Sequence, residues 1–113
     1  MLKQAFGKAD RIKKRSEITR IFRRGRSASD DKIRIRVLAN SIGRRRMAVV
    51  VSRRHGNAVR RNRIKRLCRE AFRTCRADLP DSYDYILQPQ VGAELNIESI
   101  RQSLRNLTGR AIK

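Results

Sequence analysis

The sequence predicts a two-layer α/β sandwich, in which helices cover one small sheet, and three patterns carry this prediction. Apolar and polar residues alternate strictly over 32–37, as in a half-buried strand. Met47–Val51 is a continuous apolar run whose length is typical of a strand buried on both faces. The segments 59–75 and 97–111 carry apolar residues at helical spacing. A chain of 113 residues is long enough for one domain with one modest core.

The first third of the chain is expected to hold an arm, a short helix and a loop. Residues 1–15 are basic and polar, and we interpret them as an extended or partly mobile N-terminal arm. Ser16 is the expected N-cap of the helix, and Gly25 is its expected end. Residues 26–31 are rich in Ser and Asp, which favours a loop before the first strand.

The last third of the chain is expected to hold one more strand and one more helix. Residues 83–87 read as a strand, and Pro80 ends the helix before it. Asn96 is the expected cap of the last helix, which Gly109 is expected to fray. The resulting order is close to αββαβα, with room for one further strand within 32–51.

The segment 52–76 dominates the chain, because it holds ten of the thirty Lys and Arg residues. Asn57 follows a glycine and is the expected N-cap of a helix over 59–75. One face of that helix is apolar and the opposite face is cationic. The apolar stripe consists of Ile64, Leu67, Cys68, Ala71, Phe72 and Cys75, and the opposite side carries Asn62, Arg66, Arg69 and Arg73, with Arg63 and Lys65 on its flanks.

A basic helix is usually a solvated surface, but two features favour a nucleic-acid partner here. The cations are mostly arginine, whose planar fork suits phosphate groups better than lysine does. Glu70 is the one acidic residue in the segment, so the crowded like charges have almost no internal partner.

The whole-chain charge supports this interpretation and shows where the binding surface lies. The net charge is +20, and residues 1–76 carry +21 whereas residues 77–113 carry −1. A polyanion partner follows, with affinity that depends steeply on salt. No apolar run is long enough to span a membrane and no signal peptide is visible, so we expect a cytoplasmic protein without a membrane partner.

Neither the cysteines nor the histidine suggests a catalytic or metal site. Cys68 and Cys75 fit the apolar stripe of the helix and are expected to be buried, reduced thiols. His55, the only histidine, stands beside Gly56 and is most simply a loop residue. The ten carboxylates are scattered along the chain, so we expect no catalytic residue and no bound metal on the protein itself.

The run S-R-R-H-G-N-A-V-R-R-N-R-I-K-R-L-C-R-E at 52–70 resembles the signature of the bacterial ribonuclease P protein family. Arg61-Asn62-Arg63 is similar to the R-N-R core of that family, and the order of elements agrees over nearly the whole chain. The resemblance implies a mixed sheet of about four strands with three helices in the order αβββαβα. It also implies a left-handed β-α-β crossover of the kind shared with some ribosomal proteins.

The resemblance further implies a function. Proteins of this family accompany a catalytic RNA subunit that removes the 5′ leader from precursor tRNA, and the RNA with bound divalent metal performs the hydrolysis. We therefore expect the RNA subunit and precursor tRNA as partners, no DNA, and Mg2+ as a requirement of the holoenzyme rather than a ligand of the protein.

By the same resemblance, two sets of residues are expected to bind RNA. The R-N-R region would face the RNA subunit and comprises Arg61, Asn62, Arg63, Lys65, Arg66 and Arg69. Arg53 and Arg54, close to the start of the same helix, are expected to share that role. A cleft for the single-stranded leader would be lined by Phe22, Arg34, Arg36, Ser52 and Lys65. The sequence departs from the family where Ile18 replaces a common aromatic residue and Arg36 replaces a common tyrosine, which predicts a more electrostatic cleft.

Three other functions compete with this one on composition alone. A structural rRNA-binding protein would be equally small and basic, and the long central motif is what disfavours it. A DNA-binding module would need a partner helix before the basic helix, where a strand is predicted instead. A stand-alone nuclease would need an acid–base or metal cluster.

Overall fold

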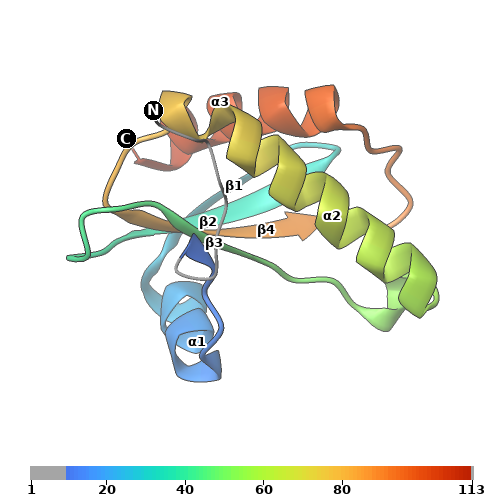
Figure 1. The fold of residues 1–113 in the computed structure, drawn as a ribbon, viewed down its shortest axis with the longest axis horizontal. Helices are drawn as coiled ribbons and strands as arrows, with labels where there is room; N and C mark the ends of the chain where they lie inside the picture. Colours follow the sequence, from blue (N-terminus) through green and yellow to red (C-terminus); the bar gives the residue numbers. More distant parts are fainter. Residues whose placement is uncertain (1–9, 113) are drawn as a thin grey trace, which may run out of the picture.

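The computed structural model describes residues 10–112, which fold into one mixed sheet with a helix on one face and two helices on the other (Figure 1). The expected α/β sandwich is therefore confirmed. Its elements are α1 (Arg15–Arg24), β1 (Arg26–Ser29), β2 (Ile33–Ala39), β3 (Arg46–Val49), α2 (Ala58–Cys75), β4 (Tyr83–Pro89) and α3 (Ile97–Ile112), with 3-10 turns η2 (Arg53–His55) and η3 (Arg76–Asp78).

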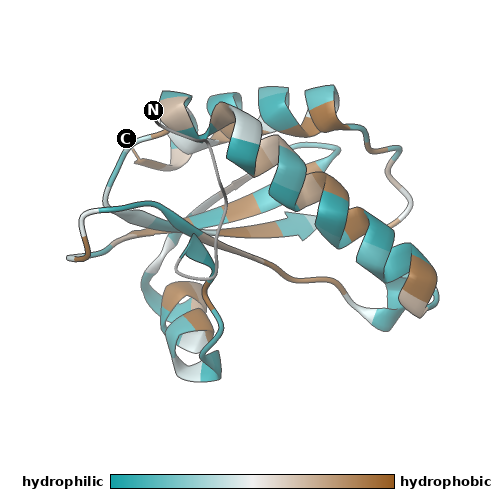
Figure 2. Ribbon diagram, in the orientation of Figure 1, coloured by the Kyte–Doolittle hydropathy of each residue, from teal (hydrophilic) through white to brown (hydrophobic). Residues whose placement is uncertain are grey.

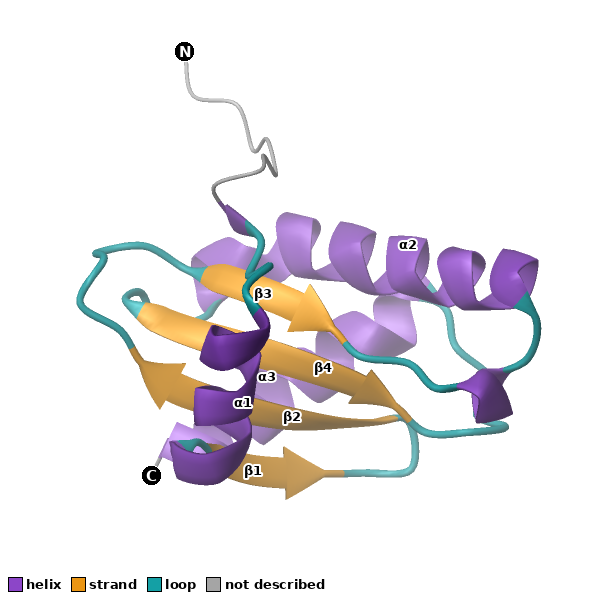
Figure 3. Ribbon diagram, turned by 90° about the horizontal axis from the view of Figure 1, so that it is seen from below, coloured by secondary structure: helices purple, strands orange, loops and turns teal. Residues whose placement is uncertain are grey.

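The sheet has the strand order β1-β2-β4-β3. β1 and β4 both pair antiparallel with β2, whereas β3 and β4 are parallel and are joined through α2. Seen from the α1 side in Figure 3, β3 lies above β4, both strands run to the right and α2 lies behind the sheet. This crossover is left-handed, as the family resemblance implies and against the usual rule for such connections.

Apolar side chains form a separate core on each face of the sheet. Figure 2 shows hydrophobic segments, in brown, on the strands and on all three helices. The larger core lies under α2 and α3, where Phe72 packs on Tyr85 with ring centroids 5.4 Å apart. The smaller core lies under α1 and centres on Ile12, Ile21 and Ile86. The strict alternation of β2 explains this division, because its buried isoleucines face α2 and α3 while its arginines face α1.

The strand register shows which residues form the floor on the α1 side. Arg36 pairs with Ser27 on β1 and with Ile86 on β4, so these three side chains form one row across the sheet. The next row begins with Ser29, Arg34 and Gln88 and reaches Val50, whose N–H donates to the carbonyl of Leu87 at 2.9 Å. Among the described residues, α1 crosses one half of this face and no helix covers the other half (Figure 3).

Several local predictions need correction. Residues 26–29, expected as a loop, form the edge strand β1, and this is where the fourth strand lies. Lys14 rather than Ser16 caps α1, and its side chain makes no capping hydrogen bond. α2 ends at Cys75, before Pro80, because the chain tightens into η3. α3 runs through Gly109 to Ile112, since its last turn packs Ala111 into the larger core.

The segment expected as an N-terminal arm is fixed to the sheet over residues 10–14. Ile12 is buried, and its N–H donates to the carbonyl of Met47 at 2.9 Å. Arg11 forms a parallel bridge with Met47, so the segment adds a short extra pairing at the β3 edge. Residues 1–9 of the expected arm lie outside the described residues.

Gly25 ends α1 for a steric reason rather than a conformational one. Its φ of −71° is open to any residue, and its N–H donates to the carbonyl of Ile21 at 2.8 Å. A Cβ atom at this position would lie 2.5 Å from that carbonyl oxygen and 2.9 Å from the carbonyl oxygen of Val37. The glycine therefore lets the end of α1 lie directly on β2.

Candidate nucleic-acid interface

The turn before α2 is held by its own side chains, which fixes where the basic helix begins. The backbone N–H of Ser52 donates to His55 Nδ1 at 3.0 Å, and the Ser52 hydroxyl accepts from the Arg54 N–H at 3.3 Å. His55 Nε2 lies 2.8 Å from the carbonyl oxygen of Pro89, which makes Nε2 the protonated nitrogen. His55 is thus a structural link between η2 and the end of β4.

Asn57 caps α2 as predicted, because its side-chain oxygen accepts from the Arg60 N–H at 2.9 Å. Gly56, which precedes it, has a φ of 118°, a conformation that strongly favours glycine. The predicted apolar stripe is confirmed, since Cys68, Ala71 and Phe72 are fully buried. The remaining members of the stripe are Cys75, which is also buried, and Ile64 and Leu67, which are half-buried.

The structure distributes the predicted RNA-subunit-binding residues over three sides of α2 and the turn before it. Asn62 and Arg66 lie on the outer face and are exposed. Arg63 lies on the flank toward α3, where it lines a groove. Arg69 lies on the opposite flank, lining a hollow at the β3 edge, and helical spacing places Arg61 and Lys65 on that flank too. Arg53 and Arg54 are exposed on η2.

Like charges are crowded at the β3 edge, where Arg69 meets the start of the described chain. Burial lowers the pKa of Arg69, and the nearby charge of Arg11 lowers it further. Arg11 and Lys13 line the same hollow. Neighbouring cations destabilise one another's charged forms, so a bound anion would stabilise this cluster.

The carboxylates within residues 10–112 neutralise little of this surface. Glu70 forms an ion pair with Arg73 one turn farther along α2, and this pair raises the pKa of Arg73 and lowers that of Glu70. Arg61, Arg63 and Arg66 form no ion pair with a carboxylate in the described part of the chain. The surface therefore presents cationic donors with few carboxylate partners among the described residues.

A buried ion network anchors α1 on the sheet. The Arg46 guanidinium donates to both oxygens of Asp84, with Nε–Oδ1 3.0 Å and Nη2–Oδ2 2.9 Å. The same Nη2 reaches Glu17 on α1 at 3.2 Å, and Asn40 donates to Asp84 at 2.8 Å. The hydrogen bond to Asp84 is the main cause that raises the pKa of Arg46.

Phe22, Arg34 and Arg36, three of the residues predicted to line the leader cleft, lie on the α1-side face of the sheet. The Arg36 guanidinium lies 4.6 Å over the centroid of the Phe22 ring, and its Nε donates to Gln88 Oε1 at 3.1 Å. Arg34 is half-buried in the next row. Burial lowers the pKa of Arg36, and the charge of Arg34 lowers it further. This floor is cationic and largely without acidic side chains.

The other two predicted cleft residues lie apart from this pair. Ser52 lies after the end of β3, with Val51 between it and Val50. Lys65 belongs to α2, which covers the opposite face of the sheet (Figure 1). Sequence reasoning missed the other floor residues, Ser27, Ser29 and Gln88. These residues can be identified only from the strand register, which requires knowing that β1 and β4 both pair with β2.

Other classes of site find no support within residues 10–112. Both cysteines are free and buried, as predicted, and burial raises the pKa of Cys68 to about 12. No three His, Cys, Asp or Glu side chains in this range lie close enough together to hold a metal ion. None of the helices in this range is long and apolar enough to cross a membrane.

The fold and the distribution of cations define a basic α/β domain whose surface is suited to a polyanion. The sequence profile of the family described as Ribonuclease P matches residues 6–112. The chain therefore belongs to the ribonuclease P protein family, whose members are protein components of a tRNA-processing endoribonuclease ribonucleoprotein.

Individual relatives agree with this assignment. The ribonuclease P protein component of Pelotomaculum thermopropionicum is 37% identical over 103 residues, which cover 90% of this chain and 92% of that protein. The RNase P protein from Thermotoga maritima matches the fold with a TM-score of 0.79 at 28% identity, covering 88% of this chain and 96% of the other. The Staphylococcus aureus RNase P protein also has a TM-score of 0.79, at 32% identity, covering 92% and 96%.

Proposed function

We propose that this protein binds the catalytic RNA subunit through α2 and η2, and binds the 5′ leader of precursor tRNA on the uncovered α1-side face. It thereby promotes removal of the leader in the cytoplasm, while the RNA subunit with Mg2+ performs the hydrolysis. The observation that carries the proposal is that three arginines of α2 form no ion pair with a carboxylate of residues 10–112, namely Arg61, Arg63 and Arg66. Phosphate groups would satisfy these donors.

Two separate surfaces support two separate RNA contacts. The α2 surface carries arginines along an 18-residue helix, which suits the backbone of a folded RNA. The α1-side face is a floor of alternating cations and hydroxyls beside Phe22, which suits a single strand. The sheet separates the two surfaces and fixes their relative position. A bound leader would thus be held at a defined place beside the RNA subunit.

Cleavage of precursor tRNA by a bacterial ribonuclease P RNA at low Mg2+, with and without this protein, tests the proposal. We expect strong stimulation by the protein and no cleavage by the protein alone. Tight binding to the RNA without stimulation would instead favour a structural rRNA-binding protein. Cleavage by the protein alone would contradict the proposal that the RNA subunit performs the hydrolysis.

Replacing Arg61 and Arg63 with Ala is expected to weaken binding to the RNA subunit without loss of fold, because neither side chain belongs to the buried stripe of α2. The loss of each arginine that contacts a phosphate should make the plot of log K against log salt less steep by about 1. The measurement is a salt titration of affinity by filter binding. Arg110→Ala, an exposed change on α3, is the control. Equal slopes for the double variant and this control would contradict the assignment.

A further inference from the structure

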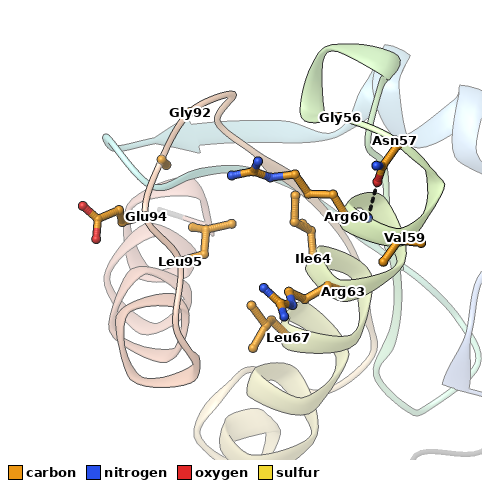
Figure 4. Close-up of a pocket in the computed structure, with 11 residues that line it drawn as sticks. Gly56, Asn57, Val59, Arg60, Arg63, Ile64, Leu67, Gly92, Glu94 and Leu95 are labelled. Carbon is orange, nitrogen blue, oxygen red and sulfur yellow. Dashed lines mark hydrogen bonds between the residues drawn. The ribbon is translucent and has the colours of Figure 1, made fainter.

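A groove opens between the first turns of α2 and the segment 92–95 that leads into α3 (Figure 4). Its volume is about 790 Å³, within the range of small-molecule sites of about 300–1,000 Å³. Ile64 and Leu67 of α2 and Leu95 of the segment form an apolar floor. The surfaces proposed above for the RNA backbone and the leader leave this floor unused.

The wall of the groove holds one large apolar side chain that is open to solvent. Val59, on the first turn of α2, lines the groove and is 77% exposed. Among residues 10–112 the other exposed large apolar side chains are Ile42, in the β2–β3 loop, and Val91, and both are less exposed. The most exposed large apolar side chain of the described residues thus lies at this groove of a highly charged protein, which favours a partner that covers it.

The groove is also cationic. Figure 4 shows the guanidinium groups of Arg60 and Arg63 beside the apolar floor, while the carboxylate of Glu94 points away from both. Neither arginine pairs with a carboxylate of the described residues. The aliphatic part of Arg60 lies against Gly56, where a Cβ atom would come within 2.7 Å of Arg60 Cδ. Gly56 therefore allows Arg60 to lie along this wall.

The opposite wall is fixed before any partner arrives. Lys32 Nζ donates to the carbonyl of Glu94 at 3.0 Å, and the Gln90 N–H donates to the carbonyl of Lys32 at 2.9 Å. The Ala93 N–H closes a turn onto the carbonyl of Gln90 at 3.3 Å. A preformed site binds without the cost of ordering its own loop.

We propose that this groove receives one extruded nucleotide of the RNA subunit, with the base on Ile64, Leu67 and Leu95 and its phosphate between Arg60 and Arg63. An unpaired nucleotide combines a flat apolar base with an anionic edge, which matches an apolar floor beside two guanidinium groups. The groove also adjoins Asn62 and Arg66 on the outer face of α2, so the RNA chain could continue there. This inference rests on the proposed binding of the RNA subunit.

Three variants of the full-length protein test the proposal by their affinity for the RNA subunit and by its salt dependence. Ala93→Trp fills the groove and Val59→Ser removes an apolar rim contact, and we expect the first to lower affinity about tenfold and the second less. Neither should change the salt slope, because neither removes a cation. Arg60→Gln should lower the slope by about 1. Ile42→Ser is the matched control, since it removes an exposed apolar side chain elsewhere.

A second experiment identifies the nucleotide. Cys68 and Cys75 are buried, so a photoreactive azide can be attached selectively to Val59→Cys. We expect one unpaired nucleotide of the RNA to cross-link. Replacing that nucleotide with an abasic one should lower the affinity of the wild-type protein, and Ala93→Trp should then cause no additional loss.

The outcomes separate this inference from the proposed function. If Ala93→Trp binds the RNA like wild type while Arg61→Ala weakens binding, the groove holds no nucleotide although the RNA-binding function stands. If the wild-type protein binds no RNA, the proposed function fails first. If Ala93→Trp changes only the mass of the protein in light scattering, the groove holds a second copy of the chain, and the nucleotide proposal is overturned.

Discussion

Replacing Asp84 with Ala is expected to lower the free energy of unfolding by about 3–5 kcal/mol, the largest loss of stability that one polar side chain should cause here. Asp84 is 1% exposed and accepts two hydrogen bonds from Arg46 and one from Asn40. Its removal leaves a buried guanidinium with Glu17 as its remaining carboxylate partner. An arginine stays protonated in proteins, so the variant cannot relieve the loss by deprotonating Arg46.

Urea unfolding of the variant and the wild-type protein, at one salt concentration, measures this loss. Asp81→Ala provides the matched control, because the Asp81 side chain is 56% exposed and lies 3.8 Å from Arg45. An exposed pair of this kind is expected to contribute less than about 1 kcal/mol. Similar losses for the two variants would show that the network around Arg46 does not stabilise the fold.

The same network connects stability to the leader-binding face. Glu17 belongs to α1, whereas Arg46 and Asp84 belong to β3 and β4, so their ion pairs set how α1 lies across the sheet. Gly25 fixes the other end of α1 against β2. The position of Phe22 over the uncovered face follows from these two anchors.

Regular patterns in the sequence predicted most of the fold. The alternation at 32–37 corresponds to β2. The apolar run at 47–51 corresponds in part to β3, which is a partly buried edge strand ending at Val49 rather than a strand buried on both faces. The Asn57 cap of α2 was predictable because it depends on a residue only three positions away. β1 was missed because its sequence, Arg-Ser-Ala-Ser, has no apolar alternation. Its strand conformation comes from pairing with β2 at the edge of the sheet.

Polar contacts between residues far apart in the sequence could not be predicted from local sequence patterns. The sequence gives no sign that Arg46 is buried, because its partner Asp84 lies 38 residues away on the parallel neighbour strand. His55 was expected as an ordinary loop residue, and the sequence carries no sign that its Nε2 meets the Pro89 carbonyl. The family resemblance named Phe22 and Arg36 as cleft residues but could not show that one covers the other.

That contact leads to the second large prediction, which concerns Arg36. The guanidinium lies over the Phe22 ring and is held by Gln88, so the ring face is already occupied and the outer face of the guanidinium is the available stacking surface. Arg36→Ala should remove this platform and one cation together. We expect precursor tRNA with a leader to bind the holoenzyme about 1–3 kcal/mol more weakly, if one base stacks there.

Leaderless tRNA separates this effect from a general loss of RNA binding, because it should bind the wild-type and Arg36→Ala holoenzymes equally. Phe22→Leu is the matched variant, since it keeps an apolar side chain under Arg36 and leaves its charge in place. We expect it to lose less affinity for the leader than Arg36→Ala does, with circular dichroism confirming that both variants fold. The reverse order would make the Phe22 ring the stacking surface, with Arg36 moving aside when the leader binds. If Arg36→Ala lowers the affinity for leaderless tRNA as much as the affinity for precursor tRNA, Arg36 does not take part in leader recognition.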